Sequence, residues 1–158
     1  MIQKIILTTL LRAVTASALL FSAAVSPSYA SDAMSPVGLW RTIDDETGKA
    51  KSLVRITEVN GEFRGTIEKL FREPNEDQNP NCDKCSGEKK NKPVIGMVIL
   101  TGLKHDGDMY SGGEILDPAN GKTYKCKTWL EDKGKKLHVR GFIGMALLGR
   151  TQVWVREE

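Results

Sequence analysis

The sequence predicts an all-β protein, an eight-stranded antiparallel up-and-down barrel that follows a cleaved signal peptide. From residue 38 onward, short runs of alternating apolar and polar residues are separated by turn signals such as Asn60-Gly61 and Asp132-Lys133-Gly134. No stretch in this part of the sequence has a helical apolar period with capping residues. Strands joined by short connections pair with their neighbours, and closing the meander into a barrel removes its exposed edges. An open sheet or a sandwich is the alternative.

The first thirty residues have the composition of a secretory signal peptide. Lys4 and Arg12 are their only charged residues, an apolar stretch follows, and Ser28-Tyr29-Ala30 supplies small residues before a cleavage site after Ala30. A membrane anchor is the alternative, because the uncharged run is about long enough to span a bilayer. We therefore expect a signal peptide over 1–30, a single barrel domain over 31–158, and a periplasmic or secreted location.

The charge of the remaining chain argues against a nucleic-acid partner. The formal net charge is +3, and losing Lys4 and Arg12 lowers it to +1. A domain this close to neutral, without a basic stripe, lacks the electrostatic footprint of a nucleic-acid binder. A chain of this length fits one domain.

The first three strands are predicted on either side of the Asn60-Gly61 turn. The strand over 38–43 is short and aromatic, and the strand over 52–57 leads into the turn. On the return strand, 63–71, alternate residues are expected to share one face: Phe63, Gly65, Ile67, Lys69 and Phe71.

The next two strands follow a long polar loop. An apolar run beginning at Pro93 predicts the fourth strand over 93–103. A turn at 105–108 leads to a glycine-containing fifth strand over 109–116, and 117–121 is the next turn.

The last three strands complete the predicted barrel. Residues 122–131 alternate cleanly, with one face formed by Tyr124, Cys126, Thr128 and Leu130. The seventh strand is predicted over 137–141. The eighth is predicted over 148–156, where both faces carry large apolar residues, so alternation leaves the inward face of this strand open.

The first and the last predicted strands resemble a signature of lipocalin-like (calycin) barrels. Gly38-Leu39-Trp40 opens the first strand, and Arg156 ends the last. The resemblance implies structural roles for Gly38, Trp40 and Arg156, in which the tryptophan plugs the closed end and an arginine packs over it. A guanidinium can stack on an indole while it donates hydrogen bonds to carbonyls. Arg150 is the alternative arginine.

Three longer blocks resemble one bacterial family. They are CDKCSGEKKNKPVIGM from Cys82, GGEILDPANGKTY from Gly112, and VRGFIGMALLGRTQVWVR from Val139. Together they are similar to the exported proteins catalogued as domain of unknown function 2147, over nearly the whole chain after residue 30. The resemblance implies a lipocalin-like barrel and export, and it implies no reaction.

The polar loop over 72–92 holds a CxxC pair, Cys82 and Cys85. An exported chain meets an oxidising environment, so we predict a disulfide between these two residues, with Cys126 free and buried. The alternatives are a longer bridge to Cys126, and thiol or metal chemistry at the pair. A loop of this length is usually functional or disordered, and this one could fold over one mouth of the barrel as a lid.

Two features favour ligand binding. The connection over 141–149 is unusually apolar for a loop, and it could line a mouth, cap the core, or touch a membrane or a partner. Arg150, Gln152 and Trp154 share one face of the last strand, and an inward orientation would give an apolar chamber a few polar groups. The residues predicted to bind a ligand are Arg150, Gln152, Trp154, Tyr124 and Phe142.

The sequence contains no evident catalytic constellation. No serine stands in a Gly-x-Ser-x-Gly elbow, and two histidines supply little acid–base chemistry. We predict no catalytic residues, no metal and no cofactor. The leading hypothesis is an exported protein that binds a small, largely apolar or amphipathic ligand inside the barrel. The alternatives are a non-enzymatic cell-envelope interaction protein with a packed barrel, and chemistry at the CxxC loop.

Overall fold

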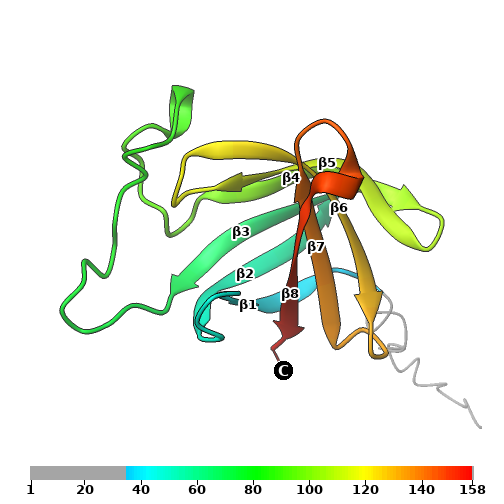
Figure 1. The fold of residues 1–158 in the computed structure, drawn as a ribbon, viewed down its shortest axis with the longest axis horizontal. Helices are drawn as coiled ribbons and strands as arrows, with labels where there is room; N and C mark the ends of the chain where they lie inside the picture. Colours follow the sequence, from blue (N-terminus) through cyan, green and yellow to red (C-terminus); the bar gives the residue numbers. More distant parts are fainter. Residues whose placement is uncertain (1–34, 158) are drawn as a thin grey trace, which may run out of the picture.

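Eight antiparallel strands form a closed barrel in the computed structural model, which describes residues 35–157 (Figure 1). The strands are β1 (Gly38–Ile43), β2 (Ala50–Val59), β3 (Glu62–Leu70), β4 (Val98–Asp106), β5 (Met109–Asp117), β6 (Lys122–Glu131), β7 (Lys136–Phe142) and β8 (Arg150–Arg156). Each strand pairs with the next, and β8 returns to pair with β1. The predicted all-β, up-and-down barrel is confirmed. The predicted signal peptide, residues 1–30, lies outside the described residues.

Two short 3₁₀ helices interrupt the connections, η2 (Gly87–Lys89) between β3 and β4 and η3 (Ala146–Leu148) between β7 and β8. Within residues 35–157, no helix has the length and apolar composition needed to cross a bilayer.

The core lies where the inward faces of the strands converge. Alternation along each strand sends every second side chain into the barrel, and burial of these apolar side chains stabilises it. The buried core includes Trp40, Val54, Ile56, Phe63, Ile67, Leu100, Leu103, Leu137, Val139 and Trp154. The ring of Tyr110 packs edge-on against Phe63, with ring centroids 4.9 Å apart.

One end of the barrel is closed by Trp40 and Arg156. The guanidinium carbon of Arg156 lies 4.3 Å from the centre of the Trp40 ring. The same guanidinium donates hydrogen bonds to the carbonyls of Ser35, Val37 and Gly134 at 2.7, 2.8 and 2.7 Å. One side chain therefore ties the chain before β1 to the β6–β7 turn, across the buried indole.

Gly38 provides the space for this arrangement. A Cβ at this position would lie 2.5 Å from Nη1 of Arg156, and the φ angle of Gly38 is +143°, which L-residues rarely adopt. The Gly-x-Trp pattern thus has a steric cause: the glycine admits the guanidinium that covers the tryptophan.

Two predicted strand starts were wrong. The fourth strand begins at Val98 rather than at Pro93, because 94–97 form a turn in which the Met97 N–H donates to the Val94 carbonyl. The last strand begins at Arg150 rather than at Leu148, because η3 occupies the end of the preceding connection. Apolar runs alone did not distinguish these turns from strand.

The predicted face of the third strand was wrong beyond Ile67. Leu53 of β2 pairs with Lys69 and Val54 pairs with Ile67, so Glu68 is an extra residue on β3. This bulge reverses the faces on which the side chains after it lie. As a result Leu70, rather than Lys69 and Phe71, lines the interior.

Replacing Arg156 with alanine is expected to destabilise the barrel by roughly 2–4 kcal/mol, because three carbonyls lose a charged donor and Trp40 loses its cover. The measurement is urea unfolding. Arg41→Ala is the control, since Arg41 makes an exposed ion pair with Glu157 worth at most about 1 kcal/mol. Equal, small effects for both variants would contradict a structural role for Arg156.

Candidate functional site

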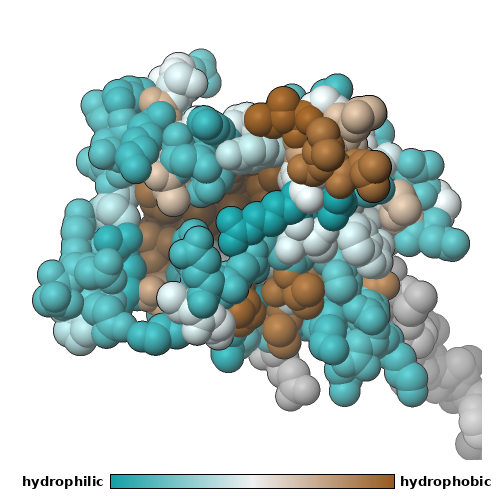
Figure 2. All heavy atoms as spheres, in the orientation of Figure 1, coloured by the Kyte–Doolittle hydropathy of each residue, from teal (hydrophilic) through white to brown (hydrophobic). Residues whose placement is uncertain are grey.

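A cavity of about 840 Å³ opens at the barrel end opposite Arg156. Its volume lies within the range of small-molecule sites, about 300–1,000 Å³. The β1–β2, β3–β4, β5–β6 and β7–β8 connections all lie at this end, because consecutive strands run antiparallel. Figure 2 shows a hollow with hydrophobic surface inside it, between the β3–β4 loop and the body of the barrel. The interior is therefore filled at one end and open at the other.

Most of the cavity wall is apolar. Trp154 lies deepest on β8 and is almost fully buried. Further apolar lining residues come from four strands and two loops: Ile67, Leu70, Val94, Ile99, Ile115, Leu116, Val139, Phe142, Ile143 and Leu148. Such a surface favours an apolar occupant, because contact with it removes hydrocarbon from water.

One side of the cavity is polar. Thr42 on β1 and Ser52 on β2 are paired across the strands, both are buried, and their hydroxyl oxygens lie 2.7 Å apart. On the neighbouring strand β8, Oε1 of Gln152 accepts a hydrogen bond from Nε1 of Trp154 at 3.4 Å. This contact leaves the amide NH₂ of Gln152 as a donor that also lines the cavity.

The five residues predicted to bind a ligand all line this cavity: Arg150, Gln152, Trp154, Tyr124 and Phe142. The inward face of β8, which alternation left open, is the face of Arg150, Gln152 and Trp154. Tyr124 comes from β6, and Phe142 ends β7, next to the mouth.

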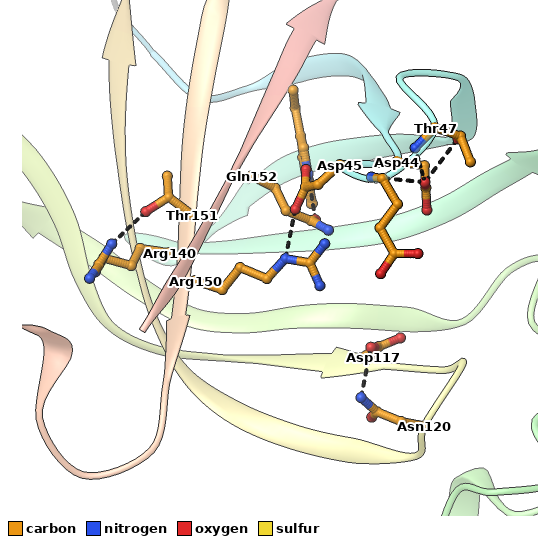
Figure 3. A network of polar contacts seen from close by, with 11 residues as sticks. Asp44, Asp45, Thr47, Asp117, Asn120, Arg140, Arg150, Thr151 and Gln152 are labelled. Atoms are coloured by element: carbon orange, nitrogen blue, oxygen red, sulfur yellow. Dashed lines mark hydrogen bonds and ion pairs between the residues drawn. The ribbon is translucent and has the colours of Figure 1, made fainter. Parts of the chain in front are cut away.

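Arg150 stands at the mouth, where it is paired with Asp45 (Figure 3). Its Nε donates to Oδ2 of Asp45 at 2.7 Å, and 63% of the arginine side chain is exposed. The turn that presents Asp45 is shaped by Asp44, whose Oδ1 accepts hydrogen bonds from the N–H and hydroxyl of Thr47. Both bonds lower the pKa of Asp44 below its ordinary value, and the bond from the N–H of Thr47 has the larger effect.

The disulfide between Cys82 and Cys85 is confirmed. Both cysteines are buried, and Sγ of Cys82 lies 3.5 Å from the carbonyl oxygen of Pro118 in the β5–β6 turn. The fit to this turn is close, because a Cβ on Gly121 would lie 1.9 Å from the carbonyl oxygen of Lys84. The disulfide thus shapes the part of the β3–β4 loop that docks on the neighbouring turn.

The sequence suggested that the β3–β4 loop could fold over one mouth of the barrel as a lid. In the structure this loop instead extends one wall of the cavity. Asp77, Pro80 and Asn81 line the mouth from this side. The loop is closed on itself by backbone hydrogen bonds, among them that from the Cys82 N–H to the Lys92 carbonyl at 2.8 Å.

Cys126 is free and buried in the barrel. Burial raises the pKa of its thiol to about 12. A longer bridge to this cysteine is excluded in the structure, since Cys82 and Cys85 pair with each other. Across the described part of the chain, no three His, Cys, Asp or Glu side chains gather closely enough to hold a metal ion.

Sequence reasoning missed Thr42, Ser52 and Asp45. The first two could have been found by period-two alternation, since Thr42 shares a face with Trp40 and Ser52 with Val54. Asp45 carried no such signal, because it lies in a turn and reaches Arg150 across 105 residues of sequence.

Comparisons with known proteins agree with this architecture. The profile of a family described as "Uncharacterized protein conserved in bacteria (DUF2147)" matches residues 38–156. Protein HP1028 from the human pathogen Helicobacter pylori, described as belonging to the lipocalin family, has a similar solved structure: the TM-score is 0.67, the sequences are 21% identical, and the match covers 79% of this chain and 84% of that one. At this identity the likeness shows a shared fold. Among curated proteins, none matches the chain significantly.

The thiol of Cys126 is expected to resist a thiol reagent at about pH 8 while the protein is folded, and to react once denaturant exposes it. Its folded pKa, about 12, lies above the ordinary value of 9.0, so the stability gained from its burial is complete below about pH 9 and is lost as the pH rises towards 12. Thiol titration and urea unfolding across this range measure both effects.

Cys126→Ser is the control, because serine has a similar size and does not titrate in this range. Rapid labelling of the folded protein, or the same fall in stability in the serine variant, would contradict a buried neutral thiol.

Proposed function

The chain belongs to the DUF2147 family, and from that premise and its open chamber we propose that it is an exported protein that binds a small, largely apolar ligand inside the barrel. One observation carries the proposal: the open end of the barrel has a mostly apolar cavity of about 840 Å³ that reaches inward as far as Trp154. Eight-stranded barrels either fill their interior with side chains or leave room for one small ligand. A packed interaction protein would show the first arrangement.

The chamber supports a ligand with a substantial hydrocarbon part. Each methylene group buried against its apolar wall contributes roughly 0.8 kcal/mol, so six to eight of them would contribute about 5–6 kcal/mol. The hydroxyls of Thr42 and Ser52 and the amide of Gln152 add hydrogen-bonding groups on one side. The ligand therefore also carries a polar group within its length, which these residues orient.

At the mouth, Arg150 offers donors to an anionic or strongly hydrogen-bond-accepting head. Among the described residues, Arg150 engages Asp45 through Nε alone, which leaves its terminal NH₂ groups as donors. A carboxylate or phosphate accepts from such a guanidinium with two parallel hydrogen bonds.

Export is supported by two features. Residues 1–30 have the composition of a signal peptide, and the chain contains a Cys82–Cys85 disulfide. Disulfides persist in oxidising compartments and are rare in the cytosol.

Gly141→Leu is expected to weaken binding of the neutral apolar probe N-phenylnaphthylamine by tenfold or more. Gly141 lines the cavity, and a Cβ there would make ordinary contacts with Tyr124 and Ile115, at 3.4 and 3.5 Å, so the leucine fits the wall and fills the chamber. Probe fluorescence gives the affinity. Thr123→Leu adds a leucine at an exposed site and is the control. Unchanged binding in Gly141→Leu would place the probe elsewhere and overturn the chamber as the site.

Arg150→Ala is expected to weaken binding of the anionic probe anilinonaphthalene sulfonate by about tenfold or more, because the sulfonate loses its charge-assisted hydrogen bonds from the guanidinium. Binding of neutral N-phenylnaphthylamine should stay unchanged, because that probe has no anionic head. Parallel fluorescence titrations measure both. An equal loss for the two probes, or no loss for either, would remove Arg150 from the head-group site.

A further inference from the structure

Residues 143–149 connect β7 to β8 and are called the β7–β8 loop below. Its four large apolar side chains are mostly exposed: Ile143 by 70%, Met145 by 66%, Leu147 by 83% and Leu148 by 77%. Figure 2 shows hydrophobic surface gathered over this loop, which stands out from the barrel in Figure 1. Exposed apolar side chains that gather in one place mark a surface that contacts something other than water.

Three consecutive carbonyls of the loop, those of Met145, Ala146 and Leu147, already accept hydrogen bonds. The carbonyl of Met145 accepts from the Leu148 N–H, and that of Ala146 accepts from the Gly149 N–H. Arg140 on β7 donates to the carbonyls of Ala146 and Leu147 at 2.7 and 2.9 Å. Water would satisfy these carbonyls in an ordinary surface loop. An apolar medium would not, and there an unpaired carbonyl costs several kcal/mol.

Cations without ion pairs lie beside the loop. Lys125 pairs in register with Phe142, and Lys127 pairs with Arg140, on the outward face of β6. Neither lysine forms an ion pair among residues 35–157. The loop and its flanks, 141–150, contain no acidic residue. Long basic side chains next to an apolar surface can reach anionic lipid headgroups while their stems stay against hydrocarbon.

We propose that the β7–β8 loop is a membrane-contact element, which inserts its apolar side chains into the surface of a bilayer containing anionic lipid. A partner protein fits less well, because specific protein interfaces use about 20–30 residues on each side and this convex loop offers four large apolar side chains. Ile143 and Leu148 also line the cavity, so insertion turns the mouth of the chamber towards the membrane. The inference does not require the chamber to hold a ligand.

A fluorophore at the loop tip tests insertion directly. Leu147→Cys is labelled with nitrobenzoxadiazole in the folded protein, where Cys126 is buried and the other two cysteines form the disulfide. Val59→Cys, labelled in the same way, reports from the opposite end of the barrel. The protein is expressed from the full-length sequence, so every variant has the same N-terminus. With vesicles of equal parts phosphatidylcholine and phosphatidylglycerol, emission at position 147 should shift to the blue, while that at position 59 should not. Equal spectra at the two positions would overturn the proposal.

Two double variants measure the contribution of the loop to binding. Met145→Ser with Leu147→Ser should lower the fraction bound to these vesicles by about tenfold or more, because inserted apolar area drives interfacial binding. Neither residue lines the cavity, so affinity for N-phenylnaphthylamine should stay unchanged. Val59→Ser with Val155→Ser is the matched control, since these are the other exposed large apolar residues among those described. Equal vesicle binding by both double variants would refute insertion of the loop.

A second copy of the chain is the competing occupant of the loop. Sedimentation without vesicles distinguishes it: a wild-type dimer that dissociates in Met145→Ser/Leu147→Ser would assign the loop to self-association and overturn the membrane proposal. A wild-type monomer that binds vesicles through the loop supports it. Loss of probe binding in the chamber with vesicle binding intact would count against the proposed ligand function alone.

Discussion

The closure of the barrel depends on a short seam between β1 and β8. Among residues 35–157, two residue pairs, Trp40 with Arg156 and Arg41 with Val155, are in register there, whereas β2 and β3 share eight. Arg156 strengthens this seam by binding three carbonyls and covering the buried indole. Because the buried Trp40 indole and the hydrogen bonds of Arg156 hold this end closed, the opposite end can remain open without loss of the fold.

The sequence predicts the parts of this structure that depend on local pattern. Alternation and turn chemistry predict the strands, and the spacing of Gly38, Trp40 and Arg156 identifies the closed end through its resemblance to lipocalins. Features that depend on the register between strands were not predictable. The bulge at Glu68, opposite Leu53 and Val54, brings Leu70 inward, and nothing in the local sequence marks it.

The candidate site was predicted only in part, because some of its features depend on local pattern and others on how distant segments meet. The five residues predicted to bind a ligand line the cavity. Period-two alternation placed Arg150, Gln152 and Trp154 on one face of β8, but the structure was needed to show that this face points inward. The pairing of Asp45 with Arg150, and the docking of the Cys82–Cys85 loop on Pro118, depend on how turns meet in space. Together these contacts build a mouth with one polar, disulfide-shaped wall and one exposed apolar rim. A rim of this kind would let an apolar ligand pass between a membrane and the chamber without crossing water.

The central claim is that the open end of the barrel holds a small, largely apolar ligand. Native mass spectrometry of protein purified from its own cell envelope, without detergent or refolding, tests this claim most directly. The account predicts a discrete adduct that leaves on denaturation and whose mass identifies the class of ligand. A bare mass for the folded protein would contradict the account.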